Sequence, residues 1–252
     1  GDGIMLITAP GQDAPIVLDY SGPAPANVDP TGMVEADTLM GPKAPLVPGA
    51  LAGWCAALER FGTKQLPELL ADAIDLASNG SPITHKNASF IAFGADQIQP
   101  FENAAATFLV DGTAPRPGSL VRQPKLAATY RQIAEHGPDA LYRGPAGEEM
   151  ARSIQEAGGF LTIDDLTSFE VEWAEPISTD FRDYEIYGMA PPSSGGHTSA
   201  EILNILEQFD VPSMSEADAM HHYLEASALA YADRAAYSGD TDSCDALGAR
   251  LR

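Results

Sequence analysis

The sequence predicts a mixed α/β (α+β) fold that is rich in helices through the middle of the chain. Apolar residues recur there at helical spacing, whereas the two flanking regions contain short runs that alternate as strands do. The regular strand–helix–strand alternation of a doubly wound sheet is missing from this pattern. A hydrophobic content of 44% and a charged content of 20% are typical of a globular chain of 252 residues.

The chain is strongly acidic, with 36 acidic against 14 basic residues and a formal net charge of −22. Such a field repels phosphate backbones, so we predict no nucleic-acid binding. No apolar run approaches the roughly 20 residues that span a membrane, and no signal peptide is recognisable. Cys55 and Cys244 lack metal-ligand spacing, and no phosphate-binding loop or dinucleotide fingerprint occurs, so neither a metal nor a cofactor is predicted.

A β-hairpin is predicted at the start of the chain, where Ile4–Thr8 and Ile16–Tyr20 flank the turn residues Pro10–Asp13. Residues 21–48 contain six prolines, so we expect a long loop in place of a long helix. A structureless loop of this length is uncommon in a compact domain and is often functional.

The middle of the chain is predicted to be helical. A short turn joins amphipathic stripes over residues 51–61 and 66–77, which predicts an antiparallel helix pair. Thr107–Val110 is the exception, because its β-branched and aromatic residues run into the turn formers Asp111-Gly112 and so predict a strand. Further helices are predicted over residues 84–98, 126–134 and 150–154.

The last third of the chain alternates between short strands and helices. Thr162 is expected to cap a short helix, with Asp164 and Asp165 near its positive end. A helix is expected to begin near Thr198 or Ser199, and Ser215 is expected to cap a long one. Strands are predicted at Val171–Trp173, Ile177–Phe181 and Tyr184–Met189. The inward face predicted for the long helix comprises Ala217, Met220, Leu224, Ala228, Tyr231 and Ala235.

The stretch Pro191–Gly196 lies between a predicted strand and a predicted helix. Its prolines stiffen the exit from the strand, and its glycines allow a turn where a Cβ would clash. The N–H groups at the helix start can bind an anion or a carbonyl oxygen. The local pattern also fits a simple connection that is rich in turn residues.

Side chains able to perform catalysis are sparse in this sequence. His197 follows Ser193 and Ser194, which suggests a nucleophile and a base, but the stretch lacks the G-x-S-x-G elbow and has no third partner. His221 and His222 are adjacent on a helix and so cannot form an i, i+4 metal pair. We therefore predict no catalytic residue in this chain, so that if the protein is an enzyme its nucleophile lies outside the chain.

Several ordered blocks resemble the γ-glutamyltransferase family of N-terminal-nucleophile hydrolases, and together they cover nearly all of the chain. The Pro191–Gly196 stretch is the most distinctive block, and Asp19–Ala26 is similar to the family's D-x-R-E-x-A-P segment. The other blocks are Gly1–Leu6, Val47–Gly53, Phe61–Thr63, Gly137–Gly144, Gly158–Thr162, Leu203–Glu207, Ala230–Arg234 and Tyr237–Asp240.

The resemblance implies an αββα sandwich and a precursor that cleaves itself. Cleavage in the family exposes a threonine at the start of a small subunit, whose hydroxyl attacks a γ-glutamyl amide such as that of glutathione. This chain would then be a single partial domain over residues 1–252, most of the large subunit, and inactive without the small subunit. The family also implies a periplasmic or secreted location, and the sequence leaves a cytoplasmic one open.

One position departs from the family pattern and bears on substrate choice. The family's arginine in the D-x-R-E block binds the α-carboxylate of the glutamyl group, and here that position is Ser21, followed by Gly22. A relative that acts on other acyl groups, or a non-catalytic binding protein on the same fold, therefore stays open. The resemblance implies substrate-side roles for Ser21, Ser193, Ser194, Gly195 and Gly196.

Overall fold

The computed structural model describes residues 3–237, which form two compact units. The first unit contains the chain up to residue 23, residues 48–54 and the chain from residue 170 onward. The second contains residues 24–47 and 55–169. Cys244 and the last part of the Tyr237–Asp240 block lie outside the described residues.

The first unit begins with the predicted hairpin, which the structure confirms. Strands β1 (Ile4–Ile7) and β2 (Ile16–Asp19) are antiparallel, and β5 (Glu172–Ala174) pairs with the other edge of β2. The strand order is therefore β1-β2-β5, with β1 at an edge. The central strand carries Val17 and Leu18, which are completely buried, and because neighbouring strand residues point to opposite faces, both faces of β2 are covered at this point.

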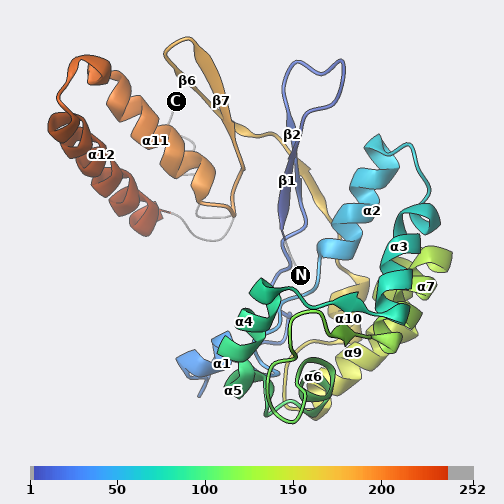
Figure 1. Cartoon of the computed structure of the whole chain (residues 1–252). Helices are drawn as coiled ribbons and strands as arrows, with labels where there is room; N and C mark the ends of the chain where they lie inside the picture. The colour runs from blue at the N-terminus through green and yellow to red at the C-terminus, as the bar shows by residue number, and fades with distance from the viewer. Residues whose placement is uncertain (1–2, 238–252) are drawn as a thin grey trace. The chain divides into compact units, whose positions relative to one another are not determined.

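A second hairpin and two helices complete this unit (Figure 1). Strands β6 (Ile177–Phe181) and β7 (Tyr184–Gly188) are antiparallel, and α11 (Gly195–Glu207) packs on both of them. Two hydrogen bonds join this helix to the hairpin: the Thr179 hydroxyl donates to Asn204 Oδ1 at 2.6 Å, and the Arg182 amide donates to Glu207 Oε1 at 2.7 Å. A short 3-10 turn, η1 (Val211–Ser213), leads to α12 (Glu216–Tyr237), which packs on α11.

The start of α12 confirms one prediction, whereas its buried face contradicts another. The Ser215 hydroxyl accepts the Asp218 amide at 3.2 Å, as a cap should. The face with larger side chains is not the buried one: Met220 is 52% exposed and Leu224 is 56% exposed, while Ala226 and Ala230 are buried. Small residues let two helices approach closely, so the alanine face packs on α11 and the larger apolar face points away.

The second unit is almost entirely helical, as predicted. Its main contact joins α3 (Leu66–Asn79) to α7 (Pro124–His136), and the Arg131 guanidinium donates to the Ser78 hydroxyl across it at 2.8 Å. The antiparallel pair predicted for the helices over 51–61 and 66–77 is wrong, because the helix that packs on α3 is α7 and not α2. The other elements are α1 (Glu35–Leu39), α2 (Ala50–Phe61, which begins in the first unit), β3 (Ser81–Pro82), α4 (His85–Phe93), α5 (Ala95–Ile98), α6 (Glu102–Phe108), β4 (Leu120–Val121), α8 (Asp139–Tyr142), α9 (Pro145–Glu156) and α10 (Ile163–Thr167).

The predicted strand at Thr107–Val110 is wrong. Thr107 belongs to the last turn of α6, and only the predicted turn at Asp111-Gly112 is present, with positive φ at both residues. An isolated bridge joins Val110 to Thr113 around that turn. The alanines that precede Thr107 are strong helix formers, so the helix extends through residues whose own preference is for strands.

The cap predicted at Thr162 also fixes the long proline-rich segment. Thr162 and Asp165 form a capping box, and the Asp165 carboxylate also accepts the amide of Ala26 at 2.8 Å. Burial of the carboxyl acts to raise its pKa, but these hydrogen bonds outweigh burial and the pKa of Asp165 is lowered. A buried charge on α10 thus holds the start of the segment that follows Ser21.

Candidate functional site

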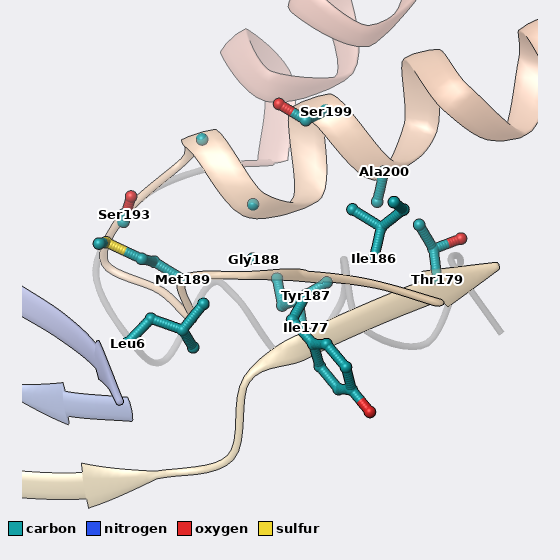
Figure 2. A pocket seen from close by; sticks show the side chains of 12 residues that line it. Leu6, Ile177, Thr179, Ile186, Tyr187, Gly188, Met189, Ser193, Ser199 and Ala200 are labelled. Carbon is teal, nitrogen blue, oxygen red and sulfur yellow. The ribbon is translucent and has the colours of Figure 1, made fainter. Parts of the chain in front are cut away.

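A pocket of about 490 Å³ lies in the first unit, between the β6–β7 hairpin and the start of α11 (Figure 2). Its walls come from both strands of the hairpin, from the connecting stretch, from the first turns of α11 and from one residue of β1. The lining residues are Leu6, Ile177, Thr179, Ile186, Tyr187, Gly188, Met189, Ser193, Gly195, Gly196, Ser199 and Ala200.

The pocket depends on a close approach between β7 and α11. A Cβ on Gly196 would lie 2.2 Å from the Met189 carbonyl oxygen, and a Cβ on Gly188 would lie 2.7 Å from the Gly196 Cα. Neither Gly195 nor Gly196 has a positive φ, so close packing, and not an unusual turn, requires glycine at position 196. The helix also begins at Gly195, a full turn before the start predicted at Thr198 or Ser199.

The structure brings together three of the five predicted site residues. Ser193, Gly195 and Gly196 all line the pocket. Ser194 does not; it immediately precedes α11, its side chain makes no capping hydrogen bond, and its carbonyl oxygen accepts the Thr198 hydroxyl at 2.7 Å. Ser21 follows β2 and is also absent from the lining, with its amide donating to Asp19 Oδ1 at 2.7 Å.

The chemistry of the lining is apolar with a few hydroxyl groups. Leu6, Ile177, Ile186 and Met189 supply most of the wall, and none of the lining residues is charged. Such a pocket suits an apolar group and offers no cation for a carboxylate. The register of β6 and β7 places Ile177 and Ile186 on one face of the hairpin, and no sequence pattern indicated that Leu6 of β1 would join them.

A polar cluster lies where α11 meets α12. His197 is 2% exposed, and burial lowers the pKa of its imidazole, as does the positive charge of Arg234. Burial raises the pKa of the Glu201 carboxyl, and the charge of Asp233 and a hydrogen bond with it raise it further. His197 is absent from the pocket lining, so the structure does not support its pairing with Ser193 as base and nucleophile.

Other reactive groups are not arranged for chemistry within the part of the chain that the structure describes. Over residues 3–237, no group of three or more His, Cys, Asp or Glu side chains could hold a metal ion. Burial raises the pKa of the Cys55 thiol, and the charge of Glu59 raises it further, which disfavours the thiolate. Among the same described residues, no helix combines the length and apolar character needed to cross a membrane.

Comparison with curated proteins identifies relatives that differ in named activity. The Glutathione hydrolase proenzyme of Escherichia coli (strain K12) is 36% identical, over 96% of this chain and 43% of the relative. The Acylase ACY 1 proenzyme of Pseudomonas sp. (strain SE83) is 40% identical, over 82% of this chain and 37% of the relative. The Oxamate amidohydrolase proenzyme of Klebsiella pneumoniae is 34% identical, over 97% of this chain and 48% of the relative. The chain thus spans less than half the length of each.

Solved structures and a family model agree with these relatives. The fold matches the γ-glutamyltranspeptidase of Helicobacter pylori with a TM-score of 0.91 at 32% identity, over 96% of this chain and 72% of that one. It also matches the cephalosporin acylase from Bacillus halodurans with a TM-score of 0.81 at 30% identity, over 92% of this chain and 45% of that one. The Gamma-glutamyltranspeptidase family model matches residues 1–249, so the chain belongs to the gamma-glutamyltranspeptidase family.

Proposed function

We propose that this chain is the large-subunit portion of an autoprocessing amide hydrolase and acyltransferase whose nucleophile is a threonine on a small subunit. The observation that carries the proposal is the family match over residues 1–249 combined with relatives that are named as proenzymes and are more than twice as long as their matched region. The described residues supply no nucleophile with a base beside it, which agrees with a nucleophile located elsewhere. The small subunit would complete an αββα sandwich.

The proposed reaction proceeds in two steps. The threonine hydroxyl attacks the substrate carbonyl while its own α-amine takes the proton, and the C–N bond then breaks as the amine leaves with a proton. Water or an amino acid attacks the resulting ester, which releases the acid or a new amide and restores the threonine hydroxyl. The large subunit would contribute to the walls that hold the acyl group.

The first candidate substrates are γ-glutamyl amides such as glutathione. The E. coli relative is named a glutathione hydrolase, and the family's ordered blocks run through this chain. A γ-glutamyl group carries an α-carboxylate and an α-ammonium, so its recognition needs charged partners. These partners would have to come from residues other than Ser21 or from the small subunit.

A second candidate substrate class, amides of non-glutamyl acyl groups, is favoured by one specific residue. Ser21 stands where the family's carboxylate-binding arginine is expected, and its amide is already used by Asp19. A serine hydroxyl cannot replace the two parallel charge-assisted bonds that a guanidinium forms with a carboxylate. Relatives named as acylases at 39–40% identity are consistent with this second class.

The experiment that tests the proposal compares two substrates on the protein produced from the complete reading frame. Hydrolysis of a γ-glutamyl anilide and of a simple acyl anilide is measured for the parent and for Ser21→Arg, with the exposed Ser89→Arg as control. If Ser21 has removed carboxylate recognition, Ser21→Arg improves kcat/KM for the γ-glutamyl substrate by roughly tenfold or more, the scale of one charge-assisted pair. Ser89→Arg leaves it unchanged.

The other outcomes have distinct meanings. High γ-glutamyl activity in the parent, with no gain in Ser21→Arg, refutes the role given to Ser21 and supports the first substrate class. No turnover of either substrate by a cleaved, folded protein contradicts the enzymatic proposal and supports a binding protein on the same fold.

A further inference from the structure

Two carboxylates lie at the end of β2, next to the residue that replaces the family's arginine. The Ser21 amide donates to Asp19 Oδ1 at 2.7 Å, so one carboxylate touches the backbone of residue 21. In the sheet register Asp19 lies directly opposite Glu172 of β5, which places both side chains on the same face. Within residues 3–237, neither carboxylate forms an ion pair. The backbone at Ser21 is therefore next to negative charge that none of the described cations offsets.

The sheet itself gains nothing from this pairing of two acids. Like charges that lie directly opposite on neighbouring strands repel each other, whereas an opposite charge at either position would stabilise the sheet. Glu172 is exposed, so it does not contribute to the core either. Packing therefore gives no reason for the second carboxylate, and its effect falls on whatever binds beside Ser21.

The ring of Tyr20 holds this part of the backbone in place. Tyr20 is buried and packs so closely on two glycines that a Cβ on Gly53 would lie 2.3 Å from its Cγ, and a Cβ on Gly3 would lie 2.9 Å from its Cε2. The Tyr20 amide also donates to the Gly3 carbonyl at 3.0 Å. Because Tyr20 lies between Asp19 and Ser21, the charge beside residue 21 cannot easily move away from a bound group.

This fixed charge bears on the acyl group that the proposed enzyme accepts. The arginine that the family pattern places at position 21 would offset a neighbouring carboxylate, whereas Ser21 adds no charge. A substrate carboxylate at residue 21 would meet like charges, and a substrate ammonium would meet opposite ones. An uncharged acyl group would be neither attracted nor repelled.

We propose that Asp19 is a specificity-determining residue that selects acyl groups with an ammonium and no carboxylate at the end that reaches residue 21. Glu172 adds to the same preference from the neighbouring strand. The substrate class is then the amides of amino-substituted acids. This inference rests on the proposed function, because it takes residue 21 to lie beside the acyl group, and it adds no chemical step to the proposed reaction.

A series of anilides that differ at a single carbon tests the preference. The γ-glutamyl anilide carries both charged groups, the 4-aminobutyryl anilide only the ammonium, the glutaryl anilide only the carboxylate and the butyryl anilide neither. We measure kcat/KM for each with the protein from the complete reading frame. The 4-aminobutyryl anilide should be preferred over the glutaryl anilide by about tenfold or more, the scale of one neighbouring charge, with the butyryl anilide between them.

Three variants assign the preference to a residue. Asp19→Asn removes the charge and keeps an oxygen that can accept the Ser21 amide, so the ratio of kcat/KM for 4-aminobutyryl over glutaryl should fall about tenfold or more. Glu172→Gln changes an exposed residue and should lower this ratio by a smaller factor. Asp29→Asn is the matched control, because Asp29 Oδ1 accepts the Thr31 amide at 2.9 Å in an exposed stretch, and it should leave the ratio unchanged. A ratio of two substrates on one preparation is independent of the active fraction, so a partly folded variant still reports it.

Several results would overturn the inference. A parent protein that cleaves the glutaryl or the butyryl anilide faster than the 4-aminobutyryl anilide would do so, as would a ratio that is unchanged in Asp19→Asn. An equal fall of the ratio in Asp29→Asn would mean that the overall charge of the chain, and not Asp19, sets the preference.

Failure of the proposed function has a different signature. If a cleaved, folded parent hydrolyses none of the anilides, the enzymatic proposal is contradicted, and calorimetric binding of the free acids then decides the role of Asp19. Tighter binding of 4-aminobutanoic acid than of glutaric acid, lost in Asp19→Asn, supports that role. Equal or absent binding of the two acids refutes it.

Discussion

The contact between β7 and α11 allows a sharp test, because two adjacent glycines differ in how much space surrounds them. In Gly196→Ala the new Cβ would lie 2.2 Å from the Met189 carbonyl oxygen and 3.1 Å from the Met189 nitrogen. Both atoms are backbone, so the strand or the helix must move by close to 1 Å. In Gly195→Ala the nearest atom is the Ser193 hydroxyl oxygen at 3.7 Å, which is an ordinary contact.

The expected magnitudes follow from that difference. Overpacking against a rigid backbone costs about 2–4 kcal/mol in the free energy of unfolding, so Gly196→Ala should be strongly destabilised. Gly195→Ala has no steric cost and restricts the unfolded chain, so it should be neutral or more stable by up to about 1 kcal/mol. Urea denaturation followed by circular dichroism measures both. Equal stabilities of the two variants would refute the close β7–α11 packing.

Three further predictions concern two carboxyl groups and one tightly packed glycine, and denaturation measures each of them, across pH for the carboxyl groups. Asp165→Asn should cost about 2–3 kcal/mol at pH 7, because an amide nitrogen would face the donors that the carboxylate accepts. Because the pKa of Asp165 is lowered in the fold, the cost of Asp165→Asn should persist above about pH 4 and shrink as the pH falls through the folded pKa. A cost that does not change with pH would contradict a charged Asp165 carboxylate. Glu201→Gln should raise the free energy of unfolding at pH 8 by a few tenths to about 1 kcal/mol. The pKa of Glu201 is raised in the fold, so its ionisation lowers the stability of the parent protein as the pH rises, and glutamine does not ionise. A variant that is less stable than the parent at pH 8 would contradict this. Gly147→Ala should cost about 3 kcal/mol, because its Cβ would lie 1.9 Å from the Leu141 carbonyl oxygen, and parental stability would refute that contact.

Local patterns predicted much of the fold because they act over a few residues. The first hairpin and the caps at Thr162 and Ser215 are set by turn formers, apolar spacing and single capping side chains. The strand predicted at Thr107–Val110 failed because the preceding alanines favour a helix that continues through it. Here the preference of neighbouring residues outweighed that of the segment itself.

Tertiary relations were less visible in the sequence. Spacing along α12 revealed an apolar stripe, but only the contact with α11 shows that Ala226 and Ala230 are the buried face. Of the five residues predicted on the substrate side, Ser193, Gly195 and Gly196 line the pocket while Ser21 and Ser194 do not, and the substrate-binding roles of all five stay predictions. Leu6 could not have been predicted, since its contribution depends on how β1 and the second hairpin meet.

Intact mass spectrometry of the protein from the complete reading frame, combined with sequencing of its N-termini, tests the proposed origin of the nucleophile most directly. We predict two chains, of which the second begins with threonine, and a single uncleaved chain when that threonine is replaced by alanine. A parent protein that remains one chain, or that is cut before a residue with no hydroxyl or thiol nucleophile, would contradict the proposal.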